Sequence, residues 1–188
     1  MNSPLTILGI AGSLRKNSYN RGALRAAQEL APEGVRIEIF DLDGIPVFNQ
    51  DEEKPPERVV QFKDRIRAAD AILSVTPEYN YSIPGVLKNA IDWASRPPNA
   101  WKDKPAAIMG ASPGFAGTAR AQYHLRQVFV NINVHALNKP EVMIANASER
   151  FDEQGNLVDE KSRNNIRKLL ESLTAWTQGF ERGRAVGT

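Results

Sequence analysis

The chain has 188 residues, 41% of them hydrophobic and 24% charged, and carries a formal net charge of +2 at pH 7. A chain of this length commonly forms one domain with a sizeable core, so we expect residues 1–188 to fold as a single domain. It contains no cysteine, which excludes disulfides and thiol chemistry and leaves any redox reaction to a bound cofactor. The two histidines lack metal-ligand spacing and the basic residues are scattered, which argues against a catalytic metal and against a nucleic-acid partner.

No apolar run approaches the length that crosses a membrane, and the first residues lack the basic and apolar regions of a signal peptide. We therefore expect no membrane partner and a cytoplasmic location.

Segments typical of strands and of helices alternate along the chain. Apolar runs and alternating residues predict strands at 5–10, 35–40, 71–75, 105–111 and 141–145. Apolar residues at helical spacing predict helices at 19–30, 58–69, 84–94, 118–131 and 159–182. Residues 41–56 are predicted to form a loop, residues 151–157 a small ribbon and residues 183–188 a frayed end. This alternation is typical of an α/β fold, in which helices cover both faces of a mostly parallel sheet.

Ligands of such sheets bind beyond the carboxyl ends of the strands, where the strand order switches. The loops after the first, third and fourth predicted strands therefore carry the candidate site. They begin at Ala11, Thr76 and Ser112.

The first loop, GIAGSLRKNSYNRG at 9–22, has the composition of a phosphate site. Ser13, Ser18 and Asn20 offer hydrogen bonds, Arg15 can fork onto phosphate oxygens, and the loop ends at a helix N-terminus. Neither the GxGxxG nor the GxxxxGK[ST] spacing occurs, so a single phosphomonoester fits better than a dinucleotide or a nucleoside triphosphate. The alternative is an ordinary turn in which Ser18 caps the helix.

The second and third loops suit a planar ring. Residues 77–83, PEYNYSI, contain a carboxylate and two tyrosines that no helix or strand requires. Residues 111–118, ASPGFAGT, contain two glycines that let the backbone approach a flat ligand, and an apolar phenylalanine. Each loop could also be a plain turn. Their joint position at one sheet edge predicts a mononucleotide site, and the ring chemistry suggests flavin.

Two motifs make the interpretation more specific. GSLRKNSYN, followed by PEYNYSIPGVLKNAIDW, resembles the NADPH-dependent FMN reductase family, in particular its bacterial quinone, chromate and azo-dye reductases. The resemblance covers nearly the whole chain. It implies a flavodoxin-like three-layer fold whose five-stranded parallel sheet has the order 2-1-3-4-5. It also implies an assembly of two or four copies.

The resemblance further implies FMN as cofactor and NADPH or NADH as electron donor. It places the FMN phosphate at Ser13, Arg15, Ser18 and Asn20. It places the flavin ring at Pro77, Glu78, Tyr79 and Asn80. The remaining wall of the pocket is placed at Ser112, Gly114 and Gly117.

The activity implied is hydride transfer from NAD(P)H, through flavin N5, to small-molecule acceptors such as quinones, azo compounds or chromate, in two successive half-reactions. No side chain is assigned as catalytic. Glu78 is the nearest candidate for proton handling, and a hydrogen-bond acceptor within its own loop is the alternative. Three other functions are considered. The net charge of +2 argues against a flavodoxin-type electron carrier without NAD(P)H turnover, because such carriers are strongly acidic. The missing GxGxxG spacing argues against a dinucleotide-binding dehydrogenase with Asp41 as the ribose ligand. The third is a flavin-binding regulatory or scaffold protein, which steady-state turnover would exclude.

Overall fold

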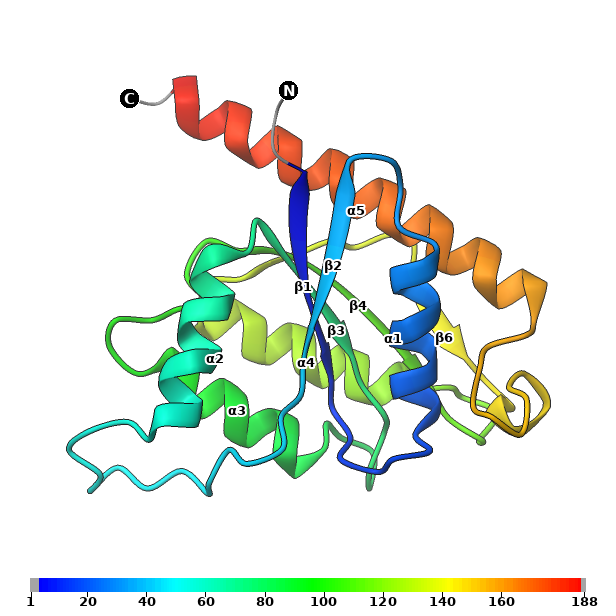
Figure 1. Cartoon of the computed structure of the whole chain (residues 1–188), viewed down its shortest axis with the longest axis horizontal. Coiled ribbons are helices and arrows are strands. Elements are labelled where there is room, and N and C mark those ends of the chain that lie inside the picture. Colours follow the sequence, from blue (N-terminus) through cyan, green and yellow to red (C-terminus); the bar gives the residue numbers. More distant parts are fainter. Residues whose placement is uncertain (1–3, 187–188) are drawn as a thin grey trace.

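The computed structural model describes residues 4–186, and its centre is a parallel sheet (Figure 1). Four strands follow the order β2-β1-β3-β4, and β4 then pairs with two short strands. The strands are β1 (Leu5–Ala11), β2 (Val35–Phe40), β3 (Ala71–Val75), β4 (Pro105–Ala111), β5 (His135–Ala136) and β6 (Val142–Ile144). The predicted flavodoxin-like order 2-1-3-4-5 is confirmed.

The fifth position of the sheet differs from the predicted strand at 141–145. β5 pairs with the start of β4, at Pro105 and Ala106, whereas β6 pairs with its end. Pro140 lies between the two short strands, and a proline has no N–H to give to a strand ladder. The fifth position is therefore shared by two short segments.

Helices cover both faces of the sheet. They are α1 (Tyr19–Glu29), α2 (Glu57–Ala68), α3 (Gly85–Ser95), α4 (Ala119–Asn131) and α5 (Glu160–Val186), with a short 3₁₀ helix, η1 (Ala147–Glu149). Buried side chains of α1 and α5 form one core with the sheet, and those of α2, α3 and α4 form the other. Every residue of β3 and β4 is buried, as expected for strands covered on both faces.

The C-terminal helix is longer than predicted. The sequence predicts its end at Arg182 and a frayed segment from Gly183, but α5 continues to Val186. Residues 187 and 188 lie outside the described residues.

The predicted ribbon at 151–157 is confirmed by an antiparallel bridge between Phe151 and Leu157. Among residues 4–186, no helix is both long and apolar enough to span a bilayer.

The start of α5 gives a prediction for acid stability. The Asp159 carboxylate accepts hydrogen bonds from the Ser162 backbone N–H at 2.8 Å and hydroxyl at 2.6 Å, and from Arg150 at 2.7 Å. The Ser162 hydroxyl bond is the largest cause that lowers the pKa of Asp159 below its usual value. A lowered pKa means that the carboxylate stabilises the fold above its unfolded pKa of about 3.9, and that this stabilisation is lost as pH falls through the lower folded value.

We therefore expect Asp159→Asn to unfold at lower urea concentration than wild type at pH 7, with the difference shrinking below about pH 4. Urea titrations between pH 7 and pH 3 measure it. Hydrogen bonds from Asn156 also lower the pKa of Asp152, so part of the acid dependence persists in the variant. Equal urea midpoints for variant and wild type at pH 7 would contradict this role of Asp159.

Candidate functional site

The loops that follow β1, β3 and β4 line one cavity of about 270 Å³ at the carboxyl edge of the sheet. The loops after β1 and β3 reach the lower edge of Figure 1. Eight of the predicted site residues line this cavity: Ser13, Arg15, Ser18, Asn20, Pro77, Glu78, Tyr79 and Ser112. Tyr19, Ala111 and Pro113 complete its lining. The predicted residues Asn80, Gly114 and Gly117 are not among these lining residues.

Glycines without room for a side chain bring the three loops together. A Cβ on Gly12 would lie 3.1 Å from Pro84 and 3.3 Å from Pro77, so the loop after β1 packs directly on the loop after β3. A Cβ on Gly110 would lie 2.2 Å from both the Thr76 carbonyl oxygen and the Thr118 hydroxyl. These glycines permit the close approach that forms the cavity.

Two serine hydroxyls in the loop after β1 retain a hydrogen to donate. Ser18 is the N-cap of α1, and its hydroxyl oxygen accepts from the Asn20 backbone N–H at 3.2 Å. Buried Ser13 accepts from the Arg15 backbone N–H at 3.3 Å. Because each hydroxyl here acts as an acceptor, its own hydrogen stays available for an anion. Capping of α1 by Ser18, the alternative from the sequence, is therefore compatible with phosphate binding.

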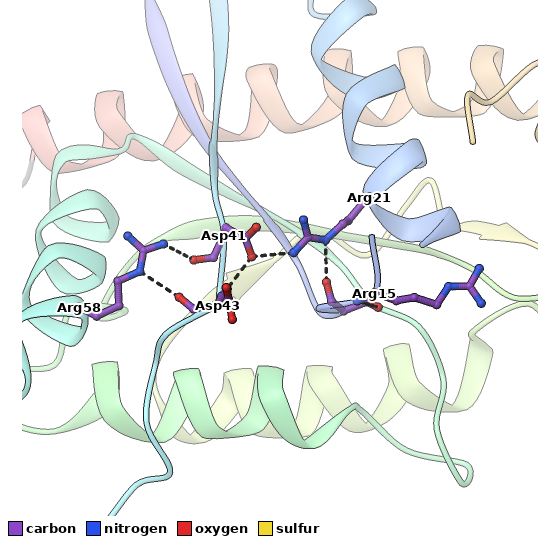
Figure 2. A network of polar contacts seen from close by, with 6 residues as sticks. Arg15, Arg21, Asp41, Asp43 and Arg58 are labelled. Atoms are coloured by element: carbon purple, nitrogen blue, oxygen red, sulfur yellow. Dashed lines mark hydrogen bonds and ion pairs between the residues drawn. The ribbon is translucent and has the colours of Figure 1, made fainter. Parts of the chain in front are cut away.

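The exposed Arg15 guanidinium supplies a positive charge to the cavity. It donates to the Asn17 carbonyl, at 2.6 Å from one terminal nitrogen, and lies 5.7 Å from the Tyr19 ring centroid. Figure 2 shows it pointing away from the aspartates at the end of β2. Tyr19 is packed in turn against Phe151, with ring centroids 5.0 Å apart. The Tyr19 ring thus forms the part of the cavity lining beside Arg15, and Phe151 packs against that ring.

Asn20 has a structural task beside its predicted one. Its amide oxygen accepts from the Ala111 N–H and its amide nitrogen donates to the Ala111 carbonyl, both at 2.9 Å. These two bonds tie the first turn of α1 to the end of β4. Direct contact of Asn20 with phosphate stays a prediction.

The tip of the loop after β3 is a tight two-residue turn. Tyr79 and Ser82 exchange two backbone hydrogen bonds of 3.0 Å, and the central residues Asn80 and Tyr81 have φ of 50° and 68°. Positive φ at both central positions is the mark of a type I′ turn. Asparagine tolerates this conformation, but for a tyrosine it costs about 1–2 kcal/mol. Contacts with α4 hold the strained tip: the Arg120 guanidinium lies 3.7 Å from the Tyr81 ring centroid, and His124 hydrogen-bonds Ser82 at 3.0 Å.

Glu78 fastens the same loop to the start of α4. Its side chain is only 5% exposed and forms an ion pair with Arg120. One carboxylate oxygen also accepts from the backbone N–H groups of Arg120, at 3.0 Å, and Ala121, at 3.2 Å. The bond to Glu78 is the largest cause that raises the pKa of Arg120. A negative charge at a helix N-terminus is favourable. Glu78 therefore stabilises the start of α4, and Arg120 neutralises its charge.

The loop after β4 is held by a hydrogen bond near its start, and Phe115 further along the loop is exposed to solvent. The Ser112 hydroxyl accepts from the Gly114 N–H at 3.2 Å. Gly117 has a positive φ of 58°, and a Cβ there would lie 3.1 Å from the Cβ of Met143. Both the backbone conformation and the close packing therefore favour glycine at this position. Phe115, in the same loop, is 90% exposed. A contact of Gly114 or Gly117 with a ligand stays a prediction.

A larger hollow of about 590 Å³ lies against α5, near β5, and includes Trp176, Phe180 and His135 in its lining. We place the site in the smaller cavity, because there two hydroxyls, a guanidinium and a helix N-terminus converge as a phosphate requires.

Comparison with known proteins shows the family of the chain. The model of the NADPH-dependent FMN reductase family matches residues 5–149. The chain belongs to this family. It is accordingly an oxidoreductase that uses FMN and NAD(P)H.

Relatives of this FMN reductase match over nearly their whole length. An NAD(P)H-dependent FMN reductase from Pseudomonas aeruginosa is 55% identical over 95% of this chain and 98% of its own. An NADPH:quinone oxidoreductase from Arabidopsis thaliana is 46% identical over 92% of each chain. Among solved structures, the flavoenzyme NAD(P)H:(acceptor) oxidoreductase FerB from Paracoccus denitrificans has a TM-score of 0.86 and 37% identity, covering 94% of this chain and 98% of that one.

The residues of the cavity fit FMN. One guanidinium, two hydroxyls and a helix N-terminus suit a phosphomonoester, and half-exposed Tyr79 with Pro77 and Pro113 offers apolar surface for a ring. The carboxylate of Glu78 does not oppose the phosphate, because Arg120 and the start of α4 neutralise it.

Two features of this site were missed from the sequence. Tyr19 lies inside the SYN part of the first motif. The sequence predicts it as the first residue of a helix and gives no sign that it lines the cavity. The partner of Glu78 is Arg120, 42 residues away, and one sequence gives no signal for such a pair.

Proposed function

We propose that this reductase transfers electrons from NAD(P)H to quinones through FMN held in the three-loop cavity. The observation that carries the proposal is the convergence in one cavity of phosphate-binding groups from the loop after β1 with half-exposed Tyr79 from the loop after β3 and Pro113 from the loop after β4. The names of its relatives support quinones as the acceptor class. Bound FMN supplies hydride acceptance and donation at its ring.

The side chains of this chain bind and orient. Arg15, Ser13 and Ser18 would hold the phosphate, and the rigid turn after Glu78 would hold the ring edge. Glu78 serves as a loop anchor and not as a proton donor in this proposal, because its carboxylate is engaged by Arg120 and two backbone N–H groups. Because Tyr79, which lines the cavity, is 51% exposed, water can reach the cavity and serve as the proton source.

The same openness supports a broad acceptor range. Tyr79, which lines the cavity, is 51% exposed, so little protein surface selects among flat or small acceptors. We propose azo compounds and chromate as further acceptors, and one binding place used in turn by NAD(P)H and by the acceptor. A cytoplasmic location and an assembly of two or four copies stay predictions.

Anaerobic absorbance spectroscopy of the FMN-loaded protein tests the proposal. Addition of NADPH is expected to bleach the flavin absorbance fully, and a quinone added after removal of the coenzyme is expected to restore it. Steady-state rates measured at several concentrations of both substrates should give parallel double-reciprocal lines. Flavin absorbance that does not respond to NADPH would contradict the proposal and favour an electron carrier.

A further inference from the structure

A hydrogen-bonded network joins the end of β2 to the loop after β1 (Figure 2). Arg21, in the first turn of α1, forms an ion pair of 2.7 Å with Asp41. The Nε of Arg21 donates to the Ser13 carbonyl at 2.9 Å. One guanidinium therefore bridges a carboxylate after β2 and a backbone carbonyl in the candidate phosphate loop.

The carboxylate end of this bridge is fixed in its own right. The Asp41 side chain also accepts from the Asp43 backbone N–H at 3.1 Å. Arg58 of α2 donates to the backbone carbonyls of Asp41, at 2.6 Å, and Asp43, at 3.1 Å. Its guanidinium carbon lies 4.2 Å from the Phe40 ring centroid. Asp41 is thus held in place by hydrogen bonds, and its carboxylate orients the Arg21 guanidinium.

Arg21 acts from outside the FMN cavity. It lines a separate hollow of about 210 Å³ together with Lys16, Arg25 and Asp41, and it is absent from the residues that line the three-loop cavity. Its charge is paired with Asp41. Arg15, in contrast, lines the cavity and points away from Asp41 in Figure 2.

We propose that Arg21 and Asp41 are positioning residues that set the affinity of the protein for the phosphate of FMN. By holding the Ser13 carbonyl, Arg21 fixes the orientation of the Ser13–Leu14 peptide group, which lies between the side chains of Ser13 and Arg15. A phosphate loop held in its binding geometry before the ligand arrives binds more tightly, because less ordering is required on binding. The inference rests on the proposed phosphate site.

A direct electrostatic role makes the opposite prediction for Asp41. If Arg21 merely attracted phosphate by its charge, removal of the neighbouring negative charge in Asp41→Asn would tighten FMN binding. If the pair positions the loop, Asp41→Asn weakens FMN binding as Arg21→Met does, but by less, because the amide oxygen of asparagine still accepts a hydrogen bond without the charge of the carboxylate. Arg21→Lys separates the two roles again, because lysine keeps the charge but lacks the planar fork that reaches two acceptors.

The test is equilibrium titration of the apoprotein with FMN and with riboflavin, followed by flavin fluorescence. Riboflavin lacks the phosphate and reports the rest of the site. We expect Arg21→Met and Arg21→Lys each to raise the Kd for FMN roughly tenfold, the effect of losing one charge-assisted hydrogen bond, and Asp41→Asn to raise it by a smaller factor, with the Kd for riboflavin unchanged in all three. Arg36→Met is the matched control, because Arg36 pairs with Glu38 at 2.7 Å on β2 away from the phosphate loop.

The outcomes separate the two levels of inference. Wild-type protein that binds FMN no better than riboflavin would overturn the proposed phosphate site itself. Wild-type preference for FMN that persists unchanged in Arg21→Met, or FMN binding that tightens in Asp41→Asn, would overturn the positioning role alone. Circular dichroism of each variant confirms that the compared proteins are folded, and Arg21→Lys preserves the test should Arg21→Met fail to fold.

Discussion

Gly110→Ala is expected to lower the free energy of unfolding by about 3 kcal/mol, at the upper end of the usual cost of overpacking. The added Cβ would lie 2.2 Å from the Thr76 carbonyl oxygen and 2.2 Å from the Thr118 hydroxyl. Both atoms belong to segments that flank the three-loop cavity, and the carbonyl is main chain, so relief requires the ends of two loops to move apart. Urea unfolding of the apoprotein measures the stability, and FMN titration should show weakened binding.

Gly85→Ala is the matched control for this substitution. Gly85 is the first residue of α3, and a Cβ there meets nothing within 4 Å. Alanine in a helix is favoured over glycine, so this variant should be as stable as wild type or up to about 1 kcal/mol more stable. Similar stability of the two alanine variants would contradict the tight packing described at Gly110.

Glu78→Ala is expected to release the loop after β3 from α4. The substitution removes the acceptor of two N–H groups at the start of α4 and leaves Arg120 without its carboxylate. Loss of such an N-terminal cap costs about 1–2 kcal/mol of unfolding free energy, measured by urea unfolding of the apoprotein. The strained Asn80–Tyr81 turn also loses support, because the same Arg120 holds Tyr81. Weaker binding of both FMN and riboflavin should follow.

Glu78→Gln distinguishes anchoring from proton transfer. Glutamine keeps one oxygen acceptor, so it should retain part of the cap and most of the quinone reductase rate. For the stability measurement on Glu78→Ala, Glu153→Ala serves as the charge-matched control, because Glu153 is exposed and surface substitutions usually change stability by less than about 0.5 kcal/mol. A Glu78→Gln protein that binds FMN normally but loses turnover would show that Glu78 handles a proton after all.

The fold was predictable where burial alone decides the structure. β3 and β4 are continuous apolar runs covered on both faces, and the sequence predicts both strands with their bounds. The fifth sheet position was less predictable, because two short strands on either side of Pro140 share it. The end of α5 was placed four residues early, since Gly183 resembles a helix terminator in sequence yet lies within the helix.

The candidate site was predictable in its location and only partly in its contacts. The carboxyl-edge rule and the two motifs place all three loops at one cavity. Contacts across the chain were not legible: Arg21 meets Asp41 over 20 residues, and Asn20 meets Ala111 over 91. The side chains that a motif offers as ligands, such as Asn20 and Glu78, also hold the loops in place. A single sequence gives the type of each residue but not its partner.

The most direct measurement of the central claim is the difference in affinity between FMN and riboflavin for Arg15→Met beside wild type. Lys16→Met is the control, because Lys16 carries the neighbouring positive charge in the same loop but is not among the residues that line the three-loop cavity. If the loop after β1 holds the phosphate, Arg15→Met weakens FMN binding by roughly tenfold or more, leaves riboflavin binding unchanged, and exceeds the effect of Lys16→Met. An unchanged FMN affinity in Arg15→Met would contradict the assignment of the phosphate to this loop.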